Sequence, residues 1–149
     1  MARLSSSLEL PNVPAEQAWQ LVTDWPAHSR WIPLTAVTID PDSPVSTGLG
    51  TRFTGRTAIG PVGFDDPMTV TGWQPPLDGT AGRCRVVKRG RWLAGWAEIE
   101  VQPTGTGCRL MWTEDIWPRW TPKAATPVVI KVGTVLFDRT LRKVATELA

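Results

Sequence analysis

The period of apolar and polar positions changes twice along the chain. Residues 3–10 (RLSSSLEL) are a modest β-strand candidate that ends at Pro11. In residues 13–25 (VPAEQAWQLVTDW) apolar side chains recur at spacings of three and four, the period of an amphipathic α-helix, and Pro14 suits its first turn. Pro26 ends this helix, and residues 26–33 (PAHSRWIP) predict a short second helix or turn.

From residue 35 to about residue 116 the period shifts to two. Short segments rich in β-branched and aromatic residues alternate with turn material such as PDSPVSTGLG, QPPLDG, KRGR and PTGTG. They predict six successive strands, most naturally an antiparallel meander, at residues 35–40, 50–58, 64–73, 82–88, 92–101 and 108–116.

The last 29 residues, 121–149, predict a long helix. Thr121-Pro122 and Thr126-Pro127 each offer an N-cap followed by a first-turn proline. The C-terminal half carries one apolar stripe, and the N-terminal half adds a second apolar face made of Val128, Val129, Val132, Val135 and Leu136. A helix that is apolar on two sides does not expose both to water, so one face should pack on the sheet. The other should meet a cavity wall, the short helices or a partner chain.

The order of these elements predicts an α+β fold. Its sheet has seven antiparallel strands that curve around the long C-terminal helix, and two short helices lie between the first and second strands. A chain of 149 residues with 42% hydrophobic and 20% charged residues predicts one domain, residues 1–149, with a real core. The formal charge of +2 gives no basic field of the kind that nucleic-acid binding requires.

The N-terminal residues lack the apolar run of a signal peptide, so we expect a cytoplasmic protein. The most apolar later segment, residues 125–137, contains Lys131 and is shorter than the roughly 20 apolar residues that cross a bilayer, so we expect no integral membrane association.

Metal, disulfide and hydrolytic chemistry are all poorly supported. Cys84 and Cys108 lack metal-ligand spacing, and turns centred on Arg89-Gly90 and Thr104-Gly105 place them opposite Gly95 and Val101, so we expect two free thiols. His28 is the sole histidine and is expected at the surface, without a matched nucleophile. The sequence therefore predicts no cofactor and no metal, and it assigns no catalytic residue.

Several local patterns, taken in order, resemble one known family. They are PAEQAWQLVTDWPAHSRWIP, GTRFTGR, FDDPMTVTGWQPP, VVKRGRWLAGWAEIEV and LMWTEDI. Together they resemble a bacterial branch of the START-like SRPBCC superfamily, the helix-grip fold of polyketide cyclase/dehydrase and lipid-transport proteins. The resemblance implies a cavity between sheet and long helix that takes lipids, polyketides, sterols or aromatic compounds. It implies no particular reaction, because the fold hosts both carriers and enzymes.

The adjacent carboxylates Asp65 and Asp66 raise the question of a catalytic pair. Neighbouring strand residues point to opposite faces, so the two do not converge on one substrate. If Phe64, Met68 and Val70 face inward, Asp66 faces inward with them. Pro67 donates no ladder hydrogen bond and could mark a bulge that resets the alternation, in which case Asp65 takes that place. A bulge cap or an arginine ion pair remains the plainer alternative for either residue.

Glu114 is a second carboxylate on an apolar face, because alternation places it with Leu110, Trp112 and Ile116. Desolvation there would raise its pKa and suit a polar anchor or a general acid. An edge ion pair with an arginine, or a solvent-facing position, is the alternative. The basic run RCRVVKRGR predicts a charged hairpin, with Arg83 and Arg85 on the outer face, although an anionic ligand head or acidic partner would also suit it.

Inward alternation and the helix face predict the side chains that bind a ligand in the cavity. These are Trp31, Phe53, Phe64, Asp66, Met68, Val70, Trp92, Trp112, Glu114, Val128, Val132 and Leu136. The nine tryptophans, in a chain without tyrosine, either line this cavity or fill the interior.

We therefore expect a protein that binds or transports a hydrophobic or aromatic small molecule, as a monomer or homodimer. A polyketide aromatase/cyclase that uses a buried carboxylate is one alternative. An interaction module that uses the C-terminal helix is another.

Overall fold

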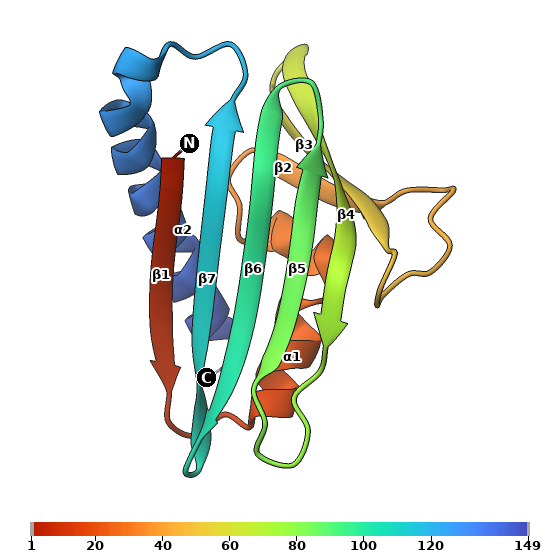
Figure 1. Cartoon of the computed structure of the whole chain (residues 1–149), viewed down its shortest axis with the longest axis vertical. Helices are drawn as coiled ribbons and strands as arrows, with labels where there is room; N and C mark the ends of the chain where they lie inside the picture. The colour runs from red at the N-terminus through yellow and green to blue at the C-terminus, as the bar shows by residue number, and fades with distance from the viewer. Residues whose placement is uncertain (1, 149) are drawn as a thin grey trace.

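The computed structural model describes residues 2–148 (Figure 1). The helical elements are α1 (Ala15–Val22), the 3-10 helices η1 (Trp25–Arg30) and η2 (Lys123–Ala125), and α2 (Thr126–Leu148). The strands are β1 (Ala2–Leu10), β2 (Thr35–Ile39), β3 (Arg52–Ile59), β4 (Val62–Gln74), β5 (Gly82–Arg89), β6 (Leu93–Thr104) and β7 (Gly107–Pro118).

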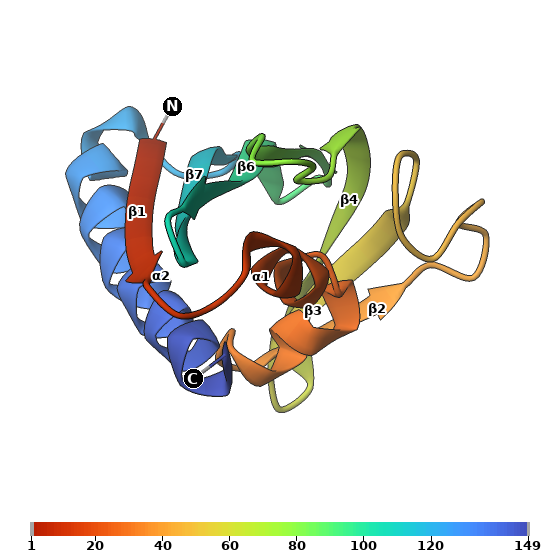
Figure 2. The ribbon, with the colours of Figure 1, turned by 90° about the horizontal axis from the view of Figure 1, so that it is seen from below.

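All seven strands form one antiparallel sheet in the order β1-β7-β6-β5-β4-β3-β2. Strands β2 to β7 are the meander that the alternating segments predict, and β1 pairs with β7. The sheet curves around α1 and η1, and α2 lies beside β1 at the open side of the curve (Figure 2). The predicted α+β fold with a curved sheet and a long C-terminal helix is confirmed.

The core lies where α1, η1 and the C-terminal half of α2 meet the concave face of the sheet. Helix α1 buries Ala18, Trp19 and Val22, the stripe that its helical period predicts. Trp25 of η1 stacks on Phe53 with ring centroids 4.4 Å apart, which adds an aromatic contact to the area that both rings bury. Helix α2 contributes Phe137, Thr140, Leu141, Val144 and Leu148.

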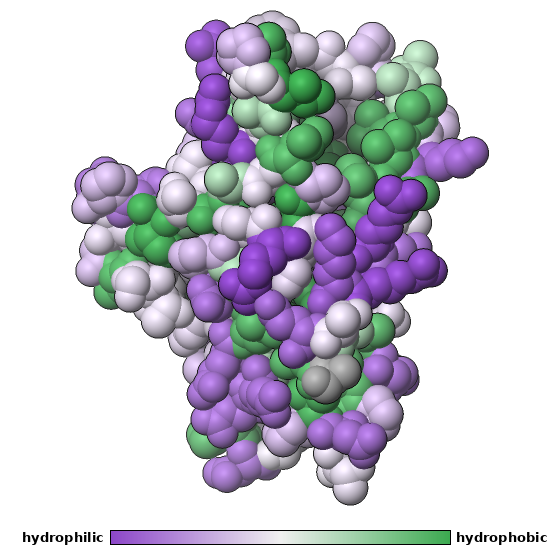
Figure 3. Space-filling view, turned by 180° about the vertical axis from the view of Figure 1, so that it is seen from behind, coloured by the Kyte–Doolittle hydropathy of each residue, from purple (hydrophilic) through white to green (hydrophobic). Residues whose placement is uncertain are grey.

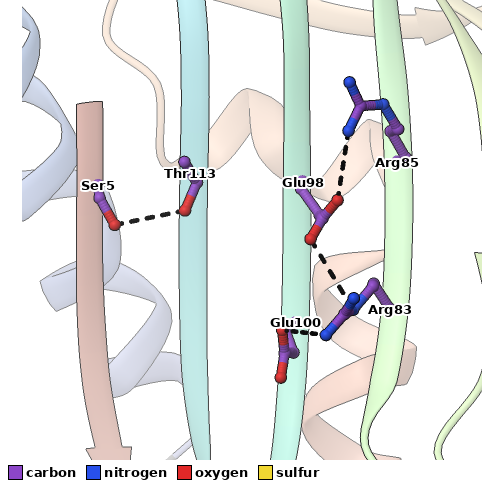
Figure 4. A network of polar contacts seen from close by, with 6 residues as sticks. All are labelled: Ser5, Arg83, Arg85, Glu98, Glu100 and Thr113. Carbon is purple, nitrogen blue, oxygen red and sulfur yellow. Dashed lines mark hydrogen bonds and ion pairs between the residues drawn. The ribbon is translucent and has the colours of Figure 1, made fainter. Parts of the chain in front are cut away.

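The convex face of the sheet carries the charges that alternation assigns to it. Arg83 pairs with Glu100 at 3.0 Å and with Glu98 at 3.8 Å, and Arg85 reaches Glu98 at 3.5 Å (Figure 4). The Arg85 guanidinium also lies 4.2 Å from the centroid of the Trp96 ring. The prediction that Arg83 and Arg85 face outward is confirmed.

Helix α2 lies close against β1 at Gly133. A Cβ built on Gly133 would lie 2.4 Å from the Leu4 side chain, so a larger residue would push the helix away from β1. Ser6 of β1 also donates a hydrogen bond to Asp138 of α2 at 2.8 Å. These contacts hold α2 against β1 and set the width of the space behind the sheet.

Candidate functional site: a cavity with a buried polar cluster

A cavity of about 230 Å³ lies between the concave face of the sheet and α2. Most of its lining is apolar, and three titratable side chains lie among it. Its lining residues are Leu4, Ile32, Thr35, Gly55, Thr57, Phe64, Asp66, Lys88, Leu93, Trp112, Glu114, Ile116, Gly133, Leu136, Phe137 and Thr140. The three threonine hydroxyls are satisfied within the protein, because Thr35 bonds Pro33 and Thr57, and Thr140 bonds the Leu136 carbonyl.

Alternation along β4 separates the two adjacent carboxylates. Asp66 is 8% exposed and lines the cavity, whereas Asp65 lies on the outer face and pairs with Arg56 at 3.0 Å. Asp65 and Asp66 are therefore not a catalytic pair, and the inward carboxylate is Asp66.

Pro67 does not reset this alternation. The register between β3 and β4 runs unbroken from Val62 to Thr69, and the irregularity in β4 falls later, between Val70 and Gly72. The ladder between β4 and β5 begins only at Met68, so the missing Pro67 amide falls outside it. Gly90 packs beside Pro67 at this point, where an added Cβ would lie 2.9 Å from the proline ring.

Lys88 lines the cavity, although the basic run that contains it predicts an exposed, charged hairpin. It lies on the inward face of β5 with Cys84 and Val86, and it is buried rather than part of the charged hairpin exterior. Its Nζ donates to Asp66 Oδ2 at 2.6 Å and approaches Met68 Sδ at 3.7 Å. Burial disfavours the ammonium, but Glu114 and Asp66 outweigh it and raise the pKa of Lys88, which stays charged.

Glu114 enters the cavity from β7, on the same face as Leu110 and Trp112. Protein atoms surround the carboxyl, although part of its surface borders the cavity. Desolvation raises its pKa, Lys88 opposes this, and the Asp66 charge adds to it. The cavity therefore holds a Lys88–Asp66 ion pair beside a carboxyl that retains its proton above the ordinary carboxyl range.

Two polar atoms at this cluster have no hydrogen-bond partner among residues 2–148. They are Oδ1 of Asp66 and the indole Nε1 of Trp112. The Trp112 indole weakly favours the ionised form of Glu114 without reaching hydrogen-bonding geometry. Buried polar groups are nearly always paired in proteins, so these two atoms have hydrogen-bonding capacity that residues 2–148 do not use.

Of the predicted cavity residues, the structure brings Phe64, Asp66, Trp112, Glu114 and Leu136 together on the cavity wall. The others do not line it. Phe53 and Val70 are packed in the core, and Trp31 is buried with its indole donating to Glu147 at 3.1 Å. Met68 is partly buried beside Lys88, on the same β4 face as Asp66.

Trp92, Val128 and Val132 also lie off the cavity wall. Trp92 lies in the β5–β6 turn, directly before β6, where it is 43% exposed and packs edge-on against Trp120. Val128 and Val132 are 64% and 54% exposed, because the N-terminal half of α2 contacts β1 rather than the middle of the sheet.

His28 is buried, so the prediction of a surface position was wrong. It lies one helical turn from both Trp25 and Trp31, and its Nε2 bonds the Val22 carbonyl at 2.8 Å. Burial lowers the pKa of His28 to about 4, which keeps the ring neutral near pH 7. The spacing of residues 25, 28 and 31 was the available signal, since it places the three rings on one face.

Both cysteines are free, as expected, and both are buried; burial raises the pKa of the Cys84 thiol to about 12. The predicted register was wrong at both hairpins, because residues 90–93 connect the paired Arg89 and Ala94, and the β6–β7 turn is centred on Gly105-Thr106 rather than Thr104-Gly105. Cys84 lies opposite Ile99, and Cys108 lies opposite Pro103 and Leu10.

An apolar hollow adjoins the cavity and shares Thr57 and Phe64 with it. Its other lining residues are Leu34, Ala58, Ile59, Val62, Gly63 and Trp92. Leu34, Ile59, Val62 and Trp92 are exposed, and so are Trp120, Val128, Val132, Val135 and Leu136. We call these nine residues the apolar rim; hydrophobic side chains gather at the corresponding end of the molecule in Figure 3.

The whole chain, residues 1–149, matches the family model described as polyketide cyclase / dehydrase and lipid transport. The chain belongs to this family. Membership confirms the START-like resemblance and a fold used for ligand binding. Among curated proteins, none matches the chain.

Solved structures of the same fold come from several bacteria. A START superfamily protein from Mycobacterium smegmatis is 14% identical with a TM-score of 0.75, covering 99% of this chain and 97% of its own. A Thermus thermophilus protein, also 14% identical, has a TM-score of 0.75 and coverages of 98% and 96%. A hypothetical protein from Helicobacter pylori, again 14% identical, has a TM-score of 0.76 and coverages of 99% and 88%. At these identities the likeness concerns the fold alone.

Two further features bear on partners. Within residues 2–148, no three His, Cys, Asp or Glu side chains gather as a ligand set for a metal ion. No helix in that same range combines the length and apolar character that a bilayer crossing requires.

Proposed function

We propose that this protein binds a hydrophobic or aromatic small molecule in the cavity between the sheet and α2, as a carrier or receptor in the cytoplasm. The observation that carries the proposal is the cavity wall itself. It is mostly apolar, and its ionisable groups are confined to one cluster, Asp66, Lys88 and Glu114; ligand sites are typically apolar with a few polar groups that fix orientation. The apolar rim beside the cavity suits the passage of such a molecule from water.

Binding of a neutral fluorescent probe, N-phenylnaphthylamine, tests this proposal. We expect saturable binding with energy transfer from tryptophan, because Trp112 lies in the cavity wall. Gly55→Leu places a side chain in the cavity, and the site of its Cβ is free of close contacts, the nearest atom being Thr35 Cγ2 at 3.6 Å. We expect this variant to weaken binding by about tenfold or more, since the probe and the new side chain compete for one volume.

Ala36→Leu is the matched control. Ala36 lies on the neighbouring strand β2 with an exposed side chain, so the same bulk is added outside the cavity. Circular dichroism checks that both variants fold. A wild-type protein that shows no saturable probe binding contradicts the proposal, and so does equal binding by the two variants.

A second candidate function, polyketide cyclisation, is favoured by one observation. Burial raises the pKa of Glu114, which lies near the Lys88–Asp66 ion pair, and a raised pKa is what a general acid requires. In this role Glu114 gives its proton to a carbonyl oxygen during ring closure.

An aryl triketone, with ring closure followed by chromatography, tests this role. Glu114→Gln should abolish turnover and leave binding of N-phenylnaphthylamine intact. Turnover that persists in Glu114→Gln, or that never occurs in the wild-type protein, rules the cyclase role out for this substrate class.

A further inference from the structure

The apolar rim gathers residues from several turns at one end of the molecule. Ile59 and Val62 pair at the β3–β4 turn, Trp92 lies in the β5–β6 turn, and Trp120 lies between β7 and α2. Trp120 packs against Trp92 with ring centroids 6.4 Å apart, and Ile59, Val62 and Trp92 line one apolar hollow. In Figure 1 these turns lie at the same end as the start of α2. The turns therefore form one apolar surface.

This surface is strongly exposed to water. Ile59, Val62 and Trp120 are each 70% exposed or more. Single exposed apolar residues are ordinary on a soluble protein, but a gathering of them marks a place where another molecule binds. The N-terminal half of α2 adds Val128, Val132 and Val135 to the rim.

The charges at this end of the molecule have one sign. Residues 59–64, 89–93 and 116–137 contain five cations and no carboxylate. All five cations are exposed, and none of them forms an ion pair with another of residues 2–148. They are Arg89, Arg91, Arg119, Lys123 and Lys131.

The carboxylates that adjoin these segments in the sequence already have partners. Asp65 pairs with Arg56 at 3.0 Å, and Asp115 lies 3.7 Å from Arg3. Asp138 accepts the hydrogen bond from Ser6. The positive charge of the rim is therefore not neutralised by these neighbours.

The cations border the apolar side chains closely. The Arg91 guanidinium lies 5.7 Å from the centroid of the Trp92 ring. Arg119 precedes Trp120, and its Nε donates to the Gly90 carbonyl at 3.0 Å, which ties it to the β5–β6 turn. On α2, Lys131 follows Val128 by three residues and precedes Val135 by four, so helical spacing places it beside both.

This combination of charge and apolar surface limits what could cover the rim. A second copy docked through the same end would bring the same five cations against each other, where they repel. A nucleic acid would meet the cations with its phosphates but would leave the valines and Ile59 without an apolar contact. An anionic bilayer suits both features, because its phosphates attract Lys and Arg while its headgroup layer takes up tryptophan and aliphatic side chains.

We propose that this end of the molecule docks on the surface of an anionic lipid bilayer. Trp92, Trp120 and Val128 enter the headgroup layer, and the five cations lie at the level of the lipid phosphates. Their long side chains reach the phosphates while the stems lie along apolar surface. Docking of this kind does not depend on what the cavity binds, so it stands apart from the proposed ligand.

Cosedimentation with sucrose-loaded vesicles tests the proposal. One set of vesicles contains equal parts of phosphatidylcholine and phosphatidylglycerol, and the other contains phosphatidylcholine alone. We expect about tenfold or tighter binding to the mixed vesicles, because each cation near an anionic leaflet strengthens binding about fivefold. Binding should weaken as salt rises from about 0.1 M to about 1 M, since the screening length falls from about 10 Å to about 3 Å.

Reversal of two charges on the rim tests the part that the cations play. The double variant Lys123→Glu, Lys131→Glu should weaken binding to the mixed vesicles about twentyfold or more. Arg142→Glu, Lys143→Glu is the matched control, since it makes the same change in net charge at exposed positions in the C-terminal half of α2. We expect about threefold or less for the control, because charges beyond the screening length contribute little.

Removal of one exposed apolar side chain tests the other part. Trp120→Ser should weaken binding about fivefold or more, since the indole is lost from the headgroup layer. Leu77→Ser is the matched control, because Leu77 is also 70% exposed but lies in the β4–β5 turn, at the opposite end of β5 from Trp92. It should leave binding unchanged. Circular dichroism checks that every variant folds.

Several results would overturn the proposal. Equal binding to both kinds of vesicle does so, and so does absence of binding. Equal losses from the two double charge reversals would mean that net charge alone attracts the protein. A dimer in sedimentation equilibrium that Trp120→Ser dissociates would assign the rim to a second copy. Tighter binding to duplex DNA than to the mixed vesicles would assign the cations to a nucleic acid.

Discussion

The two ends of the molecule use the same elements in opposite ways. At the closed end, α1, η1 and the C-terminal half of α2 fill the curve of the sheet, and Leu141 and Val144 are fully packed. At the open end, the N-terminal half of the same helix leaves Val128 and Val132 more than half exposed beside the cavity. The residue types scarcely differ between the two halves. The C-terminal half meets the core, where Phe137 lies beside Trp112 and Glu147 accepts a hydrogen bond from Trp31, whereas the N-terminal half leaves its valines in solvent.

The closed end stabilises the fold, whereas the open end holds the charged side chains of the cavity. The closed end has the stacked Trp25 and Phe53 and a neutral histidine, so it accounts for much of the buried apolar area. The open end keeps a charged cluster out of water, which costs stability and is retained where a site needs it. The tryptophans were predicted either to fill the interior or to line the cavity. Trp25 fills the core at the closed end, and Trp112 borders the cavity at the open end.

Replacing one large side chain by alanine at each end should give the largest difference between the two ends. Trp25→Ala removes a ring that is 2% exposed, and we expect it to lower the free energy of unfolding by about 3–5 kcal/mol. Leu136→Ala, at the open end, should cost less than about 1 kcal/mol, because its side chain borders the cavity and solvent. Urea denaturation of both variants measures the contrast, and equal losses would mean that the open end is packed as tightly as the closed end.

The ion pair is the exception at the open end, where a single substitution should be costly. Asp66→Ala leaves Lys88 buried without its partner, and we expect a loss of about 3–5 kcal/mol in the free energy of unfolding. The double variant Asp66→Leu, Lys88→Met should recover much of this loss, because it removes both charges. Asp65→Ala, next in the chain but exposed, should change stability by about 0.5 kcal/mol or less. Equal effects at Asp65 and Asp66 would contradict the inward placement of Asp66.

Acid should weaken the closed end through His28. The pKa of His28 falls from 6.5 to about 4 on folding, so the unfolded chain binds a proton that the folded protein excludes. Stability is therefore lost as pH falls from 6.5 towards 4, by roughly 3 kcal/mol in all. Urea denaturation of wild-type protein and His28→Gln across this range should show a pH slope that the variant lacks. If the free energy of unfolding depends on pH equally in both proteins, the group that titrates is not His28.

At the open end, Glu114 should act in the opposite direction. Its folded pKa lies above the ordinary 4.5, so the folded protein holds a proton that the unfolded chain releases, and stability falls as pH rises through this window. Glu114→Gln stays neutral, so we expect it to gain stability relative to the wild type as pH increases above 4.5. Unfolding free energies of the two proteins at a series of pH values test this, and a constant difference between them would contradict the raised pKa.

The strands and the inward carboxylates could be predicted because alternation depends on local sequence alone. Counting along β4 and β7 places Asp66 and Glu114 on the concave face, where the structure has them. The same alternation along β5 also places Lys88 on the inward face, together with Cys84 and Val86. It was missed because a lysine near a basic hairpin is usually exposed, and its partner on β4 is known only once the register is known.

The helix and the Pro-bounded segment were harder to place. Which face of α2 meets the cavity depends on its lateral position, and α2 lies against β1, so Val128 and Val132 turn to solvent and Leu136 reaches the cavity. His28 was misplaced because a polar residue in a short segment between prolines suggests a surface turn. In the structure two flanking tryptophans carry it inward. Lateral placement and burial of this kind follow from tertiary packing, which local patterns do not encode.

The position of α2 beside β1 also bears on self-association. A seven-stranded sheet that does not close into a barrel has two edges, and unpaired backbone groups along an edge can template the addition of another strand. One edge is β2, which has only five residues. The other is β1, with nine residues, and α2 lies alongside it through Gly133 and the Ser6–Asp138 hydrogen bond. Detachment of α2 would remove these contacts from the longer edge strand, so we expect the helix that borders the cavity also to limit strand addition at β1.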